Sequence, residues 1–131
     1  MQETQKTKLL ILGGTYQIAK LPPNDAIPPQ VLAQAFYTVS KTRDELSVIA
    51  PDDVPIPCEC CEKGWNILQF VESMDFSLVG VMARIAAVLA KSGISLCAVA
   101  TYSTDYVLIK NEKLEIARRA LEDAGYALRD D

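Results

Sequence analysis

The chain has 131 residues, of which half are hydrophobic and 23% are charged, and its formal net charge is −4 at pH 7. This length suits one domain, or two small modules that share a core. Because the charge balance is acidic and the basic residues are scattered, we expect no nucleic-acid partner. The sequence contains no histidine. A Ser-His or Cys-His nucleophile pair is therefore excluded, and the commonest metal ligand is missing.

The N-terminal segment, MQETQKTK, is polar and does not resemble a signal peptide. The longest apolar segment, residues 76–90, contains Arg84 and is too short to span a bilayer. We therefore predict a cytoplasmic protein with reduced thiols and no membrane partner.

Short apolar runs separated by glycine and proline dominate the first half. Residues 8–12 and 16–21 flank the Gly13-Gly14 pair, which is typical of a tight β-hairpin turn. Four prolines within residues 22–29 predict a loop, with one helical turn after it.

Two further runs, residues 36–41 and 45–50, are rich in β-forming residues and predict a second hairpin. The segment 51–64, PDDVPIPCECCEKG, holds three prolines and three cysteines and ends in glycine. We interpret it as a linker between the two halves.

The second half has more regular periodicity. Its predicted elements, in chain order, are a strand at 65–71, a helix capped by Asp75 or Ser77 and stopped at Gly93, strands at 94–102 and 106–110, a helix at 111–125 capped by Asn111, and a short strand at 126–129. On the first helix, Leu78, Met82, Ile85 and Leu89 share one face, with Val81 and Val88 beside it.

This β-α-β-β-α-β order predicts an α+β, ferredoxin-like sandwich with an antiparallel sheet and both helices on one face. The first half has similar strand spacing, with proline-rich loops where the second half has helices. We interpret it as a degenerate copy of the same unit. The predicted division is residues 1–63 for the degenerate module and 64–131 for the complete one.

Nearly the whole chain resembles the small tandem ACT-domain proteins of bacteria, which are related to the ACT modules of the cytosolic arginine sensors of animals (the CASTOR proteins). The most specific stretches are DFSLVGVMARIAAVLAKSGIS and TYSTDYVLIK, and LLILGGTYQIAKL and FYTVSKTRDELSVIAPDDVP also fit. The resemblance implies two ACT-like modules sharing a sheet, dimerisation, and regulatory binding of an amino acid or similar small molecule. It does not imply catalysis.

The start of the helix near Phe76 is the first candidate binding site. Amide N–H groups there lack helical acceptors and lie at the positive end of the helix dipole, where a carboxylate or phosphate can bind. Gly80 has no Cβ, so a ligand can approach closely; alternatively, it only permits tight packing of the helix. The candidate ligand-binding residues here are Asp75, Phe76, Ser77, Leu78, Val79 and Gly80.

Asp105 is the second candidate. In the arginine sensors, an aspartate at the matching place holds the cationic group of the ligand, so the resemblance implies this role for Asp105. An amino acid would place its carboxylate at the helix start and its cation at this aspartate. The alternative is that Asp105 only stabilises a turn. Thr101 and Tyr102 are further candidates, with core packing and hairpin pairing as their alternatives.

Cys58, Cys60 and Cys61 form a cluster in which the first and last make a C-x-x-C pair. Structural zinc sites need a second pair or histidines, and the sequence offers only Cys97 besides these three. Redox sensing is a further alternative, but Glu59 and Glu62 are expected to raise the thiol pKa values. We predict a solvent-exposed, reduced loop and no metal.

These features predict a regulatory module that senses an amino acid or related metabolite at a module or subunit interface. We expect no cofactor and no enzyme activity, because no nucleophile-base spacing, phosphate loop or metal set is present. Alanines at positions 83, 86, 87 and 90 leave a smooth helix surface, which favours a homodimer. The alternative function is a ligand-free dimerisation or protein-interaction module.

Overall fold

The computed structural model describes residues 8–71 and 78–131, with only the backbone described at positions 78 and 79. The chain forms two compact units. The larger unit combines the N-terminal segment up to Gly13 with residues 66–131, and the smaller unit comprises residues 14–65. We describe each unit by itself.

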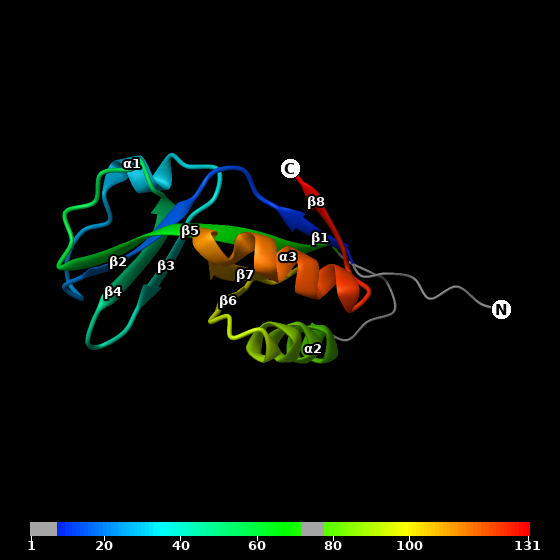
Figure 1. Ribbon diagram of the computed structural model, residues 1–131. Coiled ribbons are helices and arrows are strands. Elements are labelled where there is room, and N and C mark those ends of the chain that lie inside the picture. The colour runs from blue at the N-terminus through cyan, green and yellow to red at the C-terminus, as the bar shows by residue number, and fades with distance from the viewer. Residues whose placement is uncertain (1–7, 72–77) are drawn as a thin grey trace. The chain divides into compact units, whose positions relative to one another are not determined.

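The larger unit has a mixed α+β fold (Figure 1). Its elements are β1 (Lys8–Ile11), the second half of β5 (Cys60–Val71), α2 (Leu78–Lys91), β6 (Cys97–Ala100), β7 (Asp105–Lys110), the short 3₁₀ helix η1 (Asn111–Lys113), α3 (Leu114–Asp123) and β8 (Ala127–Asp130). The strand order in this unit is β6-β7-β5-β1-β8. The predicted α+β class and its strand-helix order are confirmed.

Strand β1 lies inside this sheet. It pairs antiparallel with β5, with Leu9 opposite Phe70, and parallel with β8, with Leu9 opposite Leu128. The predicted hairpin between β1 and the next strand is therefore wrong, and so is the purely antiparallel sheet. The prediction placed β1 in the N-terminal module, whereas its pairing assigns it to the larger unit.

The helices of the larger unit pack on one face of its sheet. Alternate strand residues face them, because side chains of a strand point to opposite faces in turn. The buried residues of this core are Leu9, Ile11, Leu68, Phe70, Val81, Ile85, Leu89, Ile94, Val107, Ile109, Ala117, Leu121 and Tyr126. On α2 the buried positions are spaced by four, and the centre of the stripe is Val81, Ile85 and Leu89, slightly rotated from the predicted face.

The helix ends follow the glycine signals in the sequence. Gly93 and Gly125 have positive φ angles of 72° and 102°, which suit a residue without Cβ. Asn111 does not cap α3 as predicted. It lies in η1, and α3 begins only at Leu114, without a side-chain cap.

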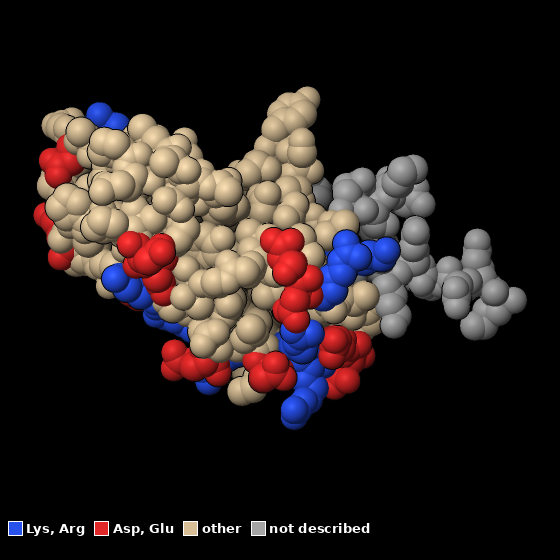
Figure 2. All heavy atoms as spheres, turned by 90° about the horizontal axis from the view of Figure 1, so that it is seen from above, with Lys and Arg blue, Asp and Glu red and all other residues tan. Residues whose placement is uncertain are grey.

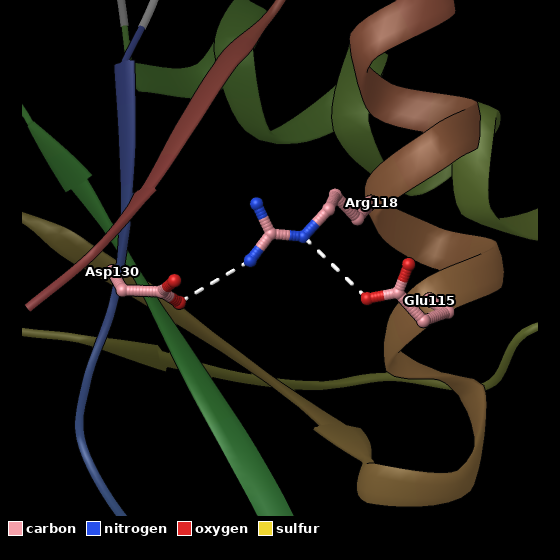
Figure 3. A network of polar contacts seen from close by, with 3 residues as sticks. All are labelled: Glu115, Arg118 and Asp130. Atoms are coloured by element: carbon pink, nitrogen blue, oxygen red, sulfur yellow. Dashed lines mark hydrogen bonds and ion pairs between the residues drawn. The ribbon is translucent and has the colours of Figure 1, made fainter.

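One polar network connects α3 to β8 (Figure 3). The Arg118 guanidinium lies 3.2 Å from Asp130 Oδ1 and 3.7 Å from Glu115 Oε2. Both carboxylates are largely exposed, so solvent screening makes the contribution of these pairs to stability small.

The smaller unit contains β2 (Tyr16–Leu21), α1 (Pro29–Leu32), β3 (Thr38–Lys41), β4 (Leu46–Pro51) and the first half of β5. Its strand order is β3-β4-β2-β5, with antiparallel pairing. The predicted β3–β4 hairpin and the helical turn after the prolines are confirmed. Its core consists of Ala19, Leu21, Val31, Leu46, Val48, Ala50 and Val54.

The segment 51–64 is only partly a linker. Strand β5 begins at Cys60 and pairs with β2, with Cys61 opposite Ala19 and Cys60 opposite Lys20. The first side chains of this strand are exposed, so no apolar alternation marks it in the sequence. Backbone hydrogen bonds to β2 hold it instead, and these depend little on side-chain type.

Two surface features bear on partners. Within the part of the chain that the structure describes, no helix is long and apolar enough to cross a membrane. On the face seen in Figure 2, basic and acidic side chains lie among one another, without a continuous basic area.

Candidate functional site

The candidate site lies at one end of the larger unit. Of the predicted residues, Asp75, Phe76 and Ser77 lie outside the described residues. Leu78, Val79 and Gly80 form the first turn of α2, whose N–H groups have no acceptor within the helix. Figure 1 shows this first turn and the end of β5 at the same end of the unit.

The β6–β7 hairpin contributes the other side of this site. Strand β7 pairs with β5, and Thr104 Oγ1 donates a hydrogen bond to Phe70 O at 2.7 Å. The start of β7 therefore lies beside the end of β5. Because β5 leads to α2 through only six residues, 72–77, the topology brings Asp105 and the first turn of α2 to the same end of the unit.

Asp105 is buried, with 9% of its surface exposed. It precedes Val107 by two residues on β7, so it shares the face on which that core residue packs against the helices. Among residues 8–71 and 78–131, the structure shows no hydrogen bond or ion pair to its carboxylate. The sequence predicted that this aspartate lies at a turn. Its burial could not be predicted, because burial depends on how the strands and helices pack.

Thr101 and Tyr102 have different surroundings. The Thr101 hydroxyl donates to Thr104 O at 2.9 Å and accepts from Thr104 N at 3.2 Å, so it closes the hairpin. The Tyr102 ring is fully exposed, at 103% of its reference surface. The structure therefore brings Asp105 into the interior, while Thr101 is engaged in the turn and Tyr102 faces solvent.

Gly80 is half-buried, and the atoms around it show whether helix packing requires a glycine at this position. A Cβ built on it would have the Arg84 Nη1 atom as its nearest neighbour, at 3.4 Å. That atom is the far end of a flexible side chain, not backbone or sheet. Tight helix packing among the described residues therefore does not require this glycine.

Arg84 is a residue that the sequence analysis did not include in the site. It is exposed, and its guanidinium lies over the first turn of α2 because it follows Gly80 by four positions. That spacing is the signal that would have identified it.

The cysteine cluster lies in the smaller unit. The Cys61 thiol donates to Gln17 Oε1 at 3.1 Å. Desolvation raises the pKa of Cys61, and the Cys58 thiol raises it further. Among the described residues, no three Cys, Asp or Glu side chains are arranged to hold a metal ion. Cys60 and Cys61 are exposed, as predicted, but they belong to a strand instead of a loop, and Cys58 packs against the core.

The raised pKa of Cys61 predicts slow alkylation. At pH 8 we expect its thiol to react more slowly with iodoacetamide in the folded chain than in the urea-unfolded chain, because less of it is thiolate. The difference should disappear as the pH rises above the folded-state pKa. Peptide mass spectrometry of quenched samples measures this for each cysteine. Equal rates in both states at pH 8 would contradict the hydrogen-bonded arrangement.

Two family models match the chain. That of the ACT domain matches residues 61–123, and one that describes an N-terminal domain matches residues 14–58. The second match falls within the smaller unit. No curated protein matches the sequence.

Solved structures match over most of the chain. A crystal structure of an Agobacterium tumefaciens protein is 29% identical, with a TM-score of 0.88, and the match covers 98% of this chain and 96% of that one. The regulatory subunit of aspartate kinase from Thermus thermophilus is 17% identical, with a TM-score of 0.58 and coverages of 85% and 93%.

Aspartate kinase from Clostridium acetobutylicum, described as an allosteric enzyme, is 14% identical, with a TM-score of 0.60. That match covers 92% of this chain and 33% of the kinase. At these identities the two kinase matches show a common fold. Together with the domain match over residues 61–123, they support an ACT-domain protein.

Proposed function

We propose that this protein is a regulatory module that binds an amino acid or related metabolite at the α2 end of the larger unit. ACT domains are regulatory, ligand-binding modules, as in aspartate kinase regulatory subunits. The observation that carries the proposal is the position of Asp105, a residue only 9% exposed for whose carboxylate the described residues provide no cationic partner.

The chemistry of the site suits a zwitterion. The ammonium or side-chain cation of the ligand would pair with the Asp105 carboxylate through a charge-assisted hydrogen bond. The ligand carboxylate would bind the N–H groups of the first turn of α2, where Gly80 leaves room. On the β6–β7 hairpin, the proposed ligand contacts are Thr101 and Tyr102. We also include in the binding site the three residues before α2: Asp75, Phe76 and Ser77.

Ligand binding would act through assembly. The exposed alanines of α2, at positions 83, 87 and 90, leave a smooth surface on which a second copy could pack. We propose a homodimer, with the ligand site close to a module or subunit interface. A ligand regulates such an assembly only if it binds one arrangement more tightly than the other.

A thermal-shift screen of the twenty amino acids tests the binding. One or a few related amino acids at millimolar concentration should raise Tm, since a ligand at 100 times its Kd adds about 2.7 kcal/mol to the free energy of unfolding. Light scattering on the same samples reports the oligomeric state. A stable dimer that no amino acid stabilises would favour the alternative, a ligand-free interaction module.

A further inference from the structure

Strand β3 forms an edge of the smaller unit. Among the strands that the structure describes, β3 pairs only with β4. Its outer side therefore carries backbone N–H and C=O groups that no described strand pairs with. Such groups are a template on which another extended chain can add as a further strand.

The turn that joins β3 to β4 identifies the residues whose backbone groups face outward. Thr42 N donates to Glu45 O at 2.9 Å across this turn. Hydrogen-bonded and non-hydrogen-bonded pairs alternate along an antiparallel ladder, so the backbone groups two and four residues before Thr42 also face β4. The N–H and C=O groups of Val39 and Lys41 therefore point away from β4.

The surface beside this edge carries no charge. Residues 26–40 contain no Asp, Glu, Lys or Arg, although 23% of the whole chain is charged. In this segment the large side chains of Leu32 and Tyr37 are exposed. Val39 packs against the core that contains Val31 of α1, so its side chain lies on the α1 face of the sheet. Seen from the α1 side in Figure 2, the smaller unit has a broad area without charged side chains. Depletion of charge and exposure of apolar side chains are typical of the centre of a protein–protein interface.

We propose that β3 is the docking site for a second copy of this chain, with the two β3 strands paired antiparallel about a two-fold axis at Val39. Such a pair is self-complementary, because each copy contributes the same groups. The outward N–H and C=O groups of Val39 then bind those of Val39 in the second copy, and Tyr37 lies opposite Lys41 of the second copy. The proposal concerns the smaller unit and depends neither on the ligand site nor on the α2 contact.

The side chains favour this occupant and this register. Tyr37, Val39 and Lys41 alternate along the chain, so they share one face of the strand. Each Tyr37 ring would meet the Lys41 ammonium of the second copy in a cation–π contact. On the other face, the hydroxyls of Thr38 and Ser40 would lie opposite each other and hydrogen-bond. Lys41 is the only charged residue of β3. Two copies of a chain with net charge −4 can therefore pair at this strand without placing like charges opposite each other.

Exchanging the two facing residues tests the register. Tyr37→Lys places like charges opposite each other twice in the symmetric pair, so the dissociation constant should rise about tenfold or more. Adding Lys41→Glu to this variant should restore association, because opposite charges then face each other across the two copies. Within one chain the two positions are four residues apart on an extended strand, too far for contact. Sedimentation velocity from micromolar to millimolar chain concentration measures each constant, and circular dichroism checks that each variant is folded.

Ile116→Lys is the matched control. Ile116 is also an exposed apolar residue, but it lies on α3 of the larger unit, so this substitution should not change the association. Each variant is also made together with Ala87→Glu, which blocks the α2 contact of the proposed homodimer. In that background the unaltered β3 should still form a dimer, and Tyr37→Lys should give a monomer. These results do not depend on whether the α2 contact or the ligand site exists. An unchanged dissociation constant in Tyr37→Lys, or no recovery in the double variant, would overturn the proposal.

Amide exchange of the wild-type chain tests the same contact without a substitution. The amides of Thr38 and Ser40 should be protected at every concentration, because they face β4. Those of Val39 and Lys41 should exchange rapidly in dilute solution and become protected as the chain concentration rises. Exchange followed by NMR resolves the four amides. If the edge instead accepts an extended segment of a different protein, Val39 and Lys41 will remain unprotected in the pure chain at all concentrations, and this result would refute pairing between copies.

Discussion

Leu9→Ala is expected to lower the free energy of unfolding by about 2–5 kcal/mol, as for other fully buried leucines. Leu9 has no exposed surface, and it lies in β1 between two paired strands of the larger unit. The substitution removes apolar contacts and leaves a cavity, because pairing on both sides holds β1 in place. Urea unfolding followed by circular dichroism measures the loss.

The chain provides a matched control for this prediction. Leu10 is the next residue, only half-buried, and points to the other face of the same strand. Leu10→Ala should therefore have a distinctly smaller effect. Similar small losses for both variants would contradict the central position of β1. The same position means that a fragment beginning at residue 64 would lack the strand that separates β5 from β8.

Asp105→Asn is expected to weaken binding of the stabilising amino acid roughly 10- to 100-fold, the range for losing a hydrogen bond to a charged group. The substitution keeps the size of the side chain and removes its charge. Because no described residue pairs with this carboxylate, we expect the stability without ligand to be unchanged or increased. Calorimetric titration with the amino acid found in the screen measures the affinity.

Asp123→Asn is the matched control for this substitution. Asp123 is an exposed aspartate at the end of α3 in the same unit, so its loss of charge should not affect binding. Unchanged affinity in Asp105→Asn would remove Asp105 from the site. A large loss of stability in that variant without ligand would instead assign Asp105 a structural role at the start of β7.

Local patterns in the sequence were enough to predict several elements. The helical spacing of apolar residues predicted α2 and α3, and the glycines that end them have the positive φ angles expected. The β3–β4 hairpin was equally recognisable, since its partners are separated by a short turn. In each case the interactions that stabilise the element lie within a few residues of one another.

The candidate site was predictable only in part. The resemblance identified Asp105, and the glycine identified the first turn of α2. Neither showed that Asp105 is a buried residue or that Arg84 lies over Gly80. Burial depends on which strands and helices pack around a side chain. The four-residue spacing from Gly80 to Arg84 brings the two together only if both lie on one helix.

The sequence by itself determined the helices, the glycines that end them, the β3–β4 hairpin and the overall α+β character. Only the tertiary structure decided that β1 inserts between β5 and β8, that β5 begins at a polar cysteine, and that Cys61 contacts Gln17. The physical reason is separation along the chain. Strands β1 and β8 are paired through backbone hydrogen bonds although they lie at opposite ends of the sequence, and such bonds are nearly independent of residue type.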